Sequence, residues 1–138
     1  MARILAIDYG LKRTGLAVTD PFRIIATALT TVSSRELIPF LKDYFKKESV
    51  DQIIIGLPLN WDESATHATP LVEKCVLELK KNFPGIPIEK VDERFTSKMA
   101  KNSMLEMGMK KKDRRKKELV DQIAATIILQ EYLNRQQA

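Results

Sequence analysis

The chain is poor in the residues on which many hydrolytic and redox sites depend. Its 138 residues include one cysteine, Cys75, and one histidine, His67. A lone cysteine excludes an internal disulfide and a cysteine-rich zinc site. A lone histidine argues against multi-histidine metal centres and against serine or cysteine catalysis with a histidine base. We therefore look for chemistry among the 18 Asp and Glu residues.

Long hydrophobic runs are also missing. No apolar stretch approaches the roughly 20 residues of a membrane span, and the start of the chain, Met1-Ala2-Arg3, lacks the layout of a signal peptide. We expect a cytoplasmic protein with no membrane partner. The length predicts one domain covering residues 1–138, with a single core.

The charge balance is positive, with a formal net charge of +5 and a sequence pI of about 9.4. This balance suits a polyanionic partner. Residues 110–117 hold seven positive charges in eight positions: Lys110, Lys111, Lys112, Arg114, Arg115, Lys116 and Lys117. We interpret this basic run as a segment that contacts nucleic-acid phosphates and releases their counterions. A solvated surface loop is the alternative.

Hydrophobic periodicity predicts three strands first, then strands and helices in alternation. The predicted strands are 3–7, 16–19, 24–32, 52–56 and 86–91, and the predicted helices are 35–47, about 70–83, 96–107 and 116–134. We expect residues 10–15 to form a turn, Ser34 to cap the first helix and Pro87 to place the last strand at an edge. This order predicts an α/β fold with a five-stranded mixed sheet and helices on both faces. Ligands of such sheets gather at the carboxyl ends of the strands.

Acidic residues follow two of the predicted strands. Asp8 comes directly after a continuously apolar run, where an uncompensated carboxylate is costly. Asp92 and Glu93 follow the last strand, and only one of the two can face a site shared with Asp8 because side chains alternate along a strand. Turn capping by Asp8 and simple surface charge at 92–93 are the alternatives.

Asp121 stands out because of its helical neighbours. It shares one face of the predicted last helix with Ala124, Ala125, Ile128 and Tyr132. We therefore expect Asp121 to face the protein body near the start of the helix, where the helix dipole offsets part of the cost. A pairing of Asp121 with Lys117, one turn earlier, is the alternative.

Three carboxylates from separate segments would repel one another at one end of the sheet. Mg²⁺ or Mn²⁺ would remove this conflict, because both ions prefer oxygen ligands. A pair of such ions can activate water and stabilise the leaving oxygen of a displacement at phosphorus. The pattern therefore predicts metal-dependent hydrolysis of a phosphodiester.

Five ordered segments also resemble one family. They are Ile7-Asp8-Tyr9-Gly10, Gly15, residues 55–60 (IGLPLN), residues 92–97 (DERFTS) and residues 120–125 (VDQIAA). Together they resemble the YqgF family, Holliday-junction-resolvase-like proteins named as pre-16S rRNA nucleases. The resemblance covers nearly the whole chain. It implies a ribonuclease H-like fold, divalent-metal dependence and a role in maturing the 5′ end of 16S rRNA in ribosome biogenesis.

The resemblance places the acidic catalytic and metal-binding residues on Asp8, Glu93 and Asp121. We expect substrate contacts from Lys12, Arg13, Asn60, Arg94 and the basic run, and surface solvation is the alternative for each cation. Precursor rRNA is the expected partner, with structured DNA as a second possibility. Cleavage of four-way DNA junctions and a non-catalytic assembly factor are the competing functions. We expect a monomer or a weak homodimer, since no apolar stripe suited to a dimer is evident.

Overall fold

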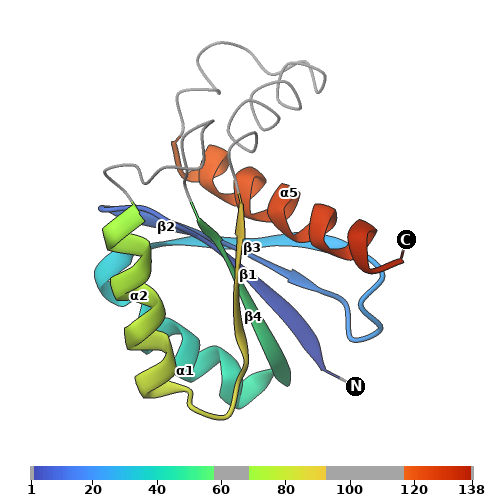
Figure 1. Ribbon diagram of the computed structural model, residues 1–138, viewed down its shortest axis with the longest axis horizontal. Coiled ribbons are helices and arrows are strands. Elements are labelled where there is room, and N and C mark those ends of the chain that lie inside the picture. The colour runs from blue at the N-terminus through green and yellow to red at the C-terminus, as the bar shows by residue number, and fades with distance from the viewer. Residues whose placement is uncertain (1, 58–68, 93–116, 138) are drawn as a thin grey trace.

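The computed structural model of the protein describes residues 2–57, 69–92 and 117–137. In chain order, its elements are β1 (Arg3–Tyr9), β2 (Arg13–Thr19), β3 (Ala26–Ser33), the short 3-10 helix η1 (Ser34–Glu36), α1 (Leu37–Lys47), β4 (Val50–Leu57), α2 (Thr69–Asn82), β5 (Ile88–Asp92) and α5 (Lys117–Gln137). Figure 1 shows their arrangement around one central sheet. The helix predicted after Thr96 lies outside the described residues. No helix within the described ranges has the length and apolarity needed to cross a bilayer.

The described strands form one sheet of five, in the order β3-β2-β1-β4-β5. β2 is antiparallel to both β1 and β3, whereas β4 is parallel to both β1 and β5. This arrangement confirms the predicted mixed sheet and the edge position of the last strand. Pro87 directly precedes β5, and its carbonyl accepts a hydrogen bond of 2.9 Å from the Ile53 amide.

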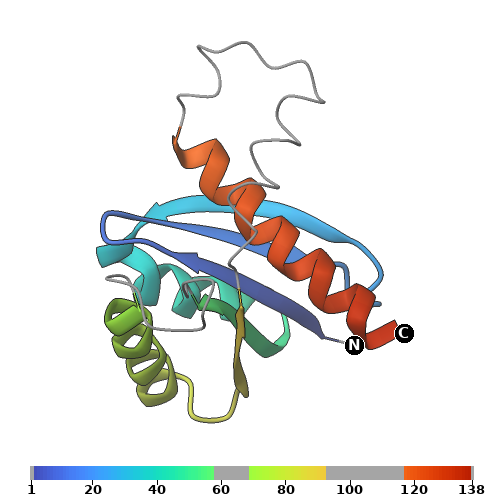
Figure 2. The ribbon, with the colours of Figure 1, turned by 45° about the horizontal axis from the view of Figure 1, so that its top comes forward.

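Helices cover both faces of the sheet, as Figures 1 and 2 show. On one face Leu5 and Ile7 of β1 join a core with residues of α1 and α2. On the other face Ile4 and Ala6 of β1 join a core with residues of α5. Successive side chains of a strand point to opposite faces, so β1 is buried on both sides. The next even-numbered residue of β1 is Asp8, which therefore points to the α5 face.

The link between β1 and β2 is shorter than the sequence indicated. β2 begins at Arg13, whereas residues 10–15 were expected to form a turn. The polar residue Thr14 is fully buried in this strand. Its burial is possible because its hydroxyl lies 2.8 Å from that of Ser34. A side-chain partner 20 residues away cannot be read from local sequence, and this explains the misplaced boundary.

The first helix also begins differently. Ser34 does not cap it: the Ser34 hydroxyl donates to the Gly10 carbonyl instead, and η1 precedes α1. α1 starts at Leu37, so Pro39 falls in the first helical turn. Amides in that turn have no partner within the helix, so the missing N–H of proline costs little there.

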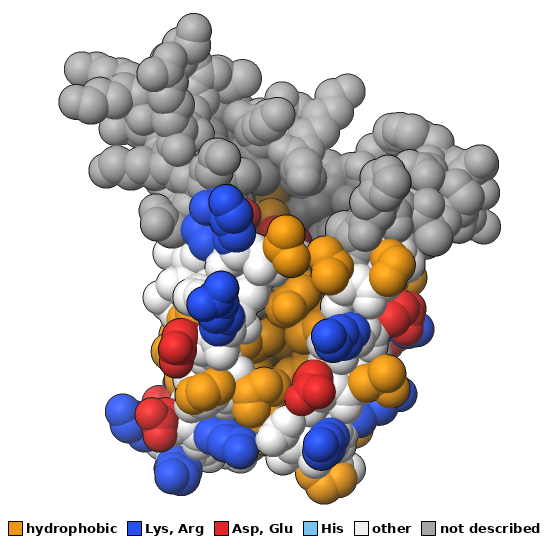
Figure 3. All heavy atoms as spheres, turned by 90° about the vertical axis from the view of Figure 1, so that its left-hand side faces the viewer, with side chains coloured by type: hydrophobic (Ala, Val, Ile, Leu, Met, Phe, Trp, Pro, Cys, Tyr) orange, Lys and Arg blue, Asp and Glu red, His pale blue; other side chains and the backbone are white. Residues whose placement is uncertain are grey.

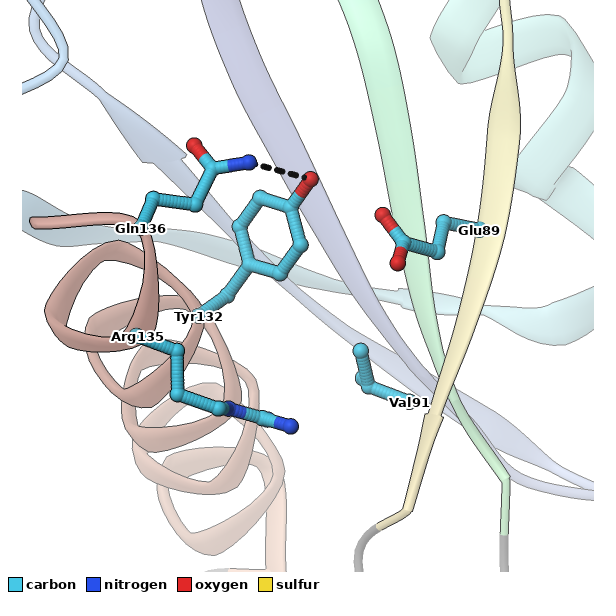
Figure 4. A pocket seen from close by; sticks show the side chains of 5 residues that line it. All are labelled: Glu89, Val91, Tyr132, Arg135 and Gln136. Carbon is cyan, nitrogen blue, oxygen red and sulfur yellow. Dashed lines mark hydrogen bonds between the residues drawn. The ribbon is translucent and has the colours of Figure 1, made fainter. Parts of the chain in front are cut away.

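The far end of α5 is hydrogen-bonded to the amino end of β4. The Tyr132 hydroxyl accepts hydrogen bonds from the side-chain amides of Gln52, at 2.6 Å, and Gln136, at 2.9 Å. Figure 4 shows Tyr132 and Gln136 beside Glu89 and Val91 at a hollow of about 290 Å³. Burial and, secondarily, the Glu89 carboxylate raise the pKa of Tyr132 above its ordinary value of 10.0.

Candidate active site

Asp8 lies near the end of β1, one residue before Tyr9 ends the strand. Its partner across the antiparallel pair is Gly15 of β2. Asp8 is half-buried on the α5 face of the sheet. The carboxylate therefore stands beside a strand position that carries no side chain.

Gly15 is the point at which α5 meets the sheet. A Cβ atom added to Gly15 would lie 2.1 Å from the backbone oxygen of Asp121 and 2.9 Å from its Cβ. Real Cβ atoms do not approach other atoms so closely, so only glycine fits here. This contact holds the first turns of α5 against β2. It also brings Asp121 next to the strand position that faces Asp8.

Asp121 occupies the helical face predicted for it. Its neighbours on that face, Ala124, Ala125, Ile128 and Tyr132, are all buried. The Asp121 side chain itself is 24% exposed, so it lies at the border of this core. Two of the predicted acids, Asp8 and Asp121, thus flank Gly15 on one face of the sheet, near the carboxyl end of β1.

Arg13 supplies a positive charge to this group. Its Nε atom lies 3.3 Å from Oδ2 of Asp121, and the Arg13 side chain is 34% exposed. A partly exposed pair of this kind adds little to stability. Its main effect is electrostatic, because one guanidinium offsets part of the repulsion between two neighbouring carboxylates. The sequence marked Arg13 as a substrate contact, and its interaction with Asp121 was not predicted.

Several predicted residues lie outside the described ranges. These are Asn60, Glu93, Arg94, Lys110, Lys111, Lys112, Arg114 and Arg115. Lys117 begins α5, and Asp92 ends β5 beside Leu57 of β4. Among residues 2–57, 69–92 and 117–137, no group of three or more His, Cys, Asp or Glu side chains could hold a metal ion. The described part of the site is therefore a pair of acids with one cation.

Gly15 is the functional position that sequence reasoning missed. It was assigned to a turn, although the resembling segments included it. The sequence feature that pointed to Gly15 was its position, at the end of a polar stretch and directly before an apolar strand. Sequence alone does not distinguish a glycine that makes room for a helix backbone from a glycine in a turn, because the helix that packs on it is far away in the chain.

Cys75 is excluded from this chemistry. It lies in α2 with 6% of its surface exposed, on the face of the sheet opposite α5. Burial, with a smaller contribution from Glu78, raises the pKa of its thiol to about 12. A thiol with this pKa stays protonated near neutral pH and is a poor nucleophile. Cys75 is therefore a core residue.

Comparison with known proteins extends the resemblance found in the sequence. A family model described as RuvX, Holliday junction resolvase, matches residues 2–135. A protein of Flavobacterium psychrophilum named "Putative pre-16S rRNA nuclease" is 55% identical over 135 residues, covering 98% of both chains. A protein of Bacteroides fragilis with the same name is 56% identical over 133 residues, covering 96% of both chains. The expected family resemblance is confirmed.

Solved structures agree on the fold. The structure of RuvC from T. thermophilus in complex with a Holliday junction substrate matches with a TM-score of 0.57 and 12% identity. The match covers 100% of this chain and 97% of that one. At this identity the likeness shows the fold alone, and it confirms the predicted ribonuclease H-like architecture. The chain belongs to the RuvX family, a family of nucleases.

Proposed function

We propose that the protein is a metal-dependent nuclease that cleaves precursor 16S rRNA in 5′-end maturation, with Asp8, Glu93 and Asp121 as its catalytic carboxylates. The observation that carries the proposal is the position of Asp8 and Asp121 on either side of Gly15. Two acids on one face of the sheet, on either side of a single residue, repel each other unless a cation is shared between them. A protein that only bound RNA would gain nothing from acids beside a polyanion.

The donor set fits a divalent ion. Asp8 and Asp121 offer carboxylate oxygens, which Mg²⁺ and Mn²⁺ prefer. Both side chains are partly exposed, so an ion there would keep room for water and phosphate oxygens. One or two such ions would supply a nucleophile at neutral pH and offset the charge on the cleaved phosphate.

Glu93 completes the proposed set. It follows Val91 by two positions, and Val91 packs in the core shared with α5. β5 ends at Asp92 beside Leu57 of β4, and Glu93 lies outside the described residues. The choice of Glu93 over Asp92 rests on the family resemblance, which places the third acid on Glu93.

Arg13 has a positioning role in this proposal. Its guanidinium binds Asp121 at 3.3 Å and holds the carboxylate near Gly15 before an ion is bound. A divalent ion at Asp121 would compete with Arg13 for the same oxygen atoms. The released guanidinium would then be available to a phosphate oxygen, to which arginine donates well.

The test uses purified full-length protein with a labelled fragment of precursor 16S rRNA, in Mg²⁺, Mn²⁺ or chelator. We expect cleavage only with metal, and loss of cleavage in Asp8→Asn and Asp121→Asn. Asp43→Asn is the matched control, because Asp43 is an exposed carboxylate of α1. Cleavage in chelator, or unchanged cleavage by Asp8→Asn, would contradict the proposal.

A second candidate substrate is a four-way DNA junction. It is favoured by the description of the family as Holliday junction resolvases. The same assay with a labelled junction separates the two substrates. Cleavage of the junction but not of the precursor rRNA would replace the first proposal with the second. Tight RNA binding with no cleavage of either substrate would favour the assembly-factor function.

A further inference from the structure

A basic hollow lies beside the proposed active site. It has a volume of about 550 Å³ and is lined by Leu11, Lys12, Ser33 and Arg35. The first two residues form the β1–β2 link, and the others lie where β3 ends and η1 begins. On the side of the molecule that carries α1 and α2, Figure 3 shows side chains of both charge signs around a hollowed apolar surface.

The pairing of β3 with β2 places the hollow close to the acids. Ser33 pairs with Arg13 across the antiparallel strands β3 and β2. Side chains of directly paired residues lie on the same face. Arg13 in turn binds Asp121. The basic hollow therefore begins one residue pair away from the proposed metal site.

Its walls are held in place before any ligand binds. The Ser34 amide donates to the Lys12 carbonyl at 3.0 Å. The Ser34 hydroxyl donates to the Gly10 carbonyl, which leaves the Thr14 hydroxyl to donate to Ser34. These bonds fix the β1–β2 link against η1. A ligand would not have to order this backbone, and that lowers the entropic cost of binding.

The charges of the hollow are uncompensated within the described residues. Lys12 and Arg35 are exposed, and neither has an ion-pair partner in the described part of the chain. Four other cations of the described residues form ion pairs: Arg3 with Glu48, Arg13 with Asp121, Arg23 with Asp51 and Lys90 with Glu73. Exposed lysines such as Lys80 and Lys81 of α2 do not, so what sets Lys12 and Arg35 apart is that both line one hollow. Two free cations facing one hollow favour an anionic ligand.

Leu11 narrows the choice of ligand. It is 72% exposed, one of the most exposed large apolar side chains in the described residues. An apolar side chain next to two cations and a hydroxyl does not suit free phosphate. It suits a nucleotide, which has an anionic phosphate on one side and an apolar base face on the other.

We propose that the basic hollow binds the nucleotide adjacent to the cleaved bond of an RNA strand. Lys12 and Arg35 contact its phosphates, Ser33 donates to a phosphate oxygen, and Leu11 packs against the base or ribose. This inference rests on the proposed function, because it places the strand relative to the acids. It adds Leu11, Ser33 and Arg35 to the substrate-binding residues predicted from the sequence. It also implies that the RNA strand runs from the acids toward the end of β3.

The first test measures RNA binding in chelator, so that cleavage does not interfere. The test variant is Lys12→Gln/Arg35→Gln. The matched control is Lys80→Gln/Lys81→Gln, which removes the same charge from two exposed residues at the end of α2. We expect at least about a fivefold loss of affinity at low salt in the test variant only. Its log–log salt slope should be flatter by roughly 0.7 per lost phosphate contact on single strands. Equal binding by the two double variants would overturn the proposal.

The second test locates the strand. Leu11 is replaced by a photoreactive benzoylphenylalanine, and the cross-linked nucleotide is mapped against the cleavage position. We expect cross-links next to the cut, and cross-links confined to distant nucleotides would overturn the placement. A wild-type protein that cleaves nothing would overturn the proposed function instead. The binding comparison in chelator does not depend on that outcome.

Discussion

Gly15 and Asp121 are in backbone contact although 106 positions separate them in the chain: an added Cβ at Gly15 would lie 2.1 Å from the Asp121 carbonyl oxygen. At the centre of the proposed site, the backbone of α5 occupies the space that a side chain at position 15 would need. It fixes the distance from α5 to β2, and with it the position of the Asp121 carboxylate relative to Asp8. The geometry of the acids thus depends on a residue that has no side chain.

We predict that Gly15→Ala displaces the start of α5. The added methyl group must push the helix backbone away, and overpacking of this kind costs roughly 1–3 kcal/mol. Denaturant unfolding should show this loss, and cleavage should fall with it. Gly85→Ala is the control, because nothing lies within 4 Å of a Cβ added there. Equal stability of the two variants would contradict the close contact.

Removing one acid should relieve repulsion in the metal-free protein. We predict that Asp8→Asn leaves the unfolding free energy unchanged or raises it, because active-site groups are often kept at a cost in stability. Millimolar Mg²⁺ or Mn²⁺ should raise the melting temperature of the wild type. A metal concentration a hundredfold above Kd adds about 2.7 kcal/mol to the apparent free energy of unfolding. The rise should be much smaller in Asp8→Asn. A metal-indifferent wild type together with a destabilised variant would contradict the metal site.

Arg13 should oppose metal binding in the resting protein. We predict that Arg13→Gln lowers stability in chelator by up to ~1 kcal/mol, since a partly exposed ion pair is lost. The same change should strengthen Mn²⁺ binding, because a competing cation has left Asp121. Calorimetric titration with Mn²⁺ measures this affinity. Arg35→Gln removes an equal charge outside the acid pair and should leave the Mn²⁺ affinity nearly unchanged.

Cys75 should be inert in the folded protein. Its pKa of about 12 and its burial both disfavour the thiolate. We predict that iodoacetamide at pH 8 alkylates it far more slowly than a free thiol, and that urea restores the normal rate. Rapid alkylation without urea would place Cys75 at the surface. The raised pKa also predicts how stability depends on pH. The thiol ionises at a lower pH in the unfolded chain than in the folded protein, so the free energy of unfolding falls as the pH rises above 9.

Tyr132 should contribute to the same alkaline loss. Its pKa is raised in the folded protein, so the stability linked to it is fully present below pH 10 and is lost as the pH rises further. We predict that Tyr132→Phe shows a shallower loss in this range. At pH 7 the variant should be less stable by roughly 0.5–1.5 kcal/mol, because Gln52 and Gln136 lose their acceptor. Urea unfolding at pH 7 and pH 10.5 measures both effects.

Much of the fold could be predicted from periodicity. The apolar run at the start of the chain indicated a strand buried on both faces, and the sheet order confirms its central position. The stripe of Asp121, Ala124 and Ile128 indicated which side of α5 faces the sheet. Both features depend on spacing within one element, and spacing is visible in a sequence.

The contacts between elements could not be predicted in the same way. The start of β2 was misplaced because the partner that satisfies buried Thr14 is Ser34. The Arg13–Asp121 ion pair was not predicted, because local sequence offered only Lys117, one helical turn away, whose side chain lies outside the described part of the structure. Each of these contacts joins residues that only the folded chain brings together, so no local pattern predicts them.

The Arg13–Asp121 pair spans 108 positions, and this has a consequence for synthesis. Chains grow from the N-terminus at about 5–20 residues per second, so β1 and β2 leave the ribosome well before α5. Until then Asp8 and Arg13 are present without Asp121. A nascent or prematurely terminated chain therefore carries an incomplete set of acids, and the proposed cleavage begins only once α5 has been made and has docked at Gly15.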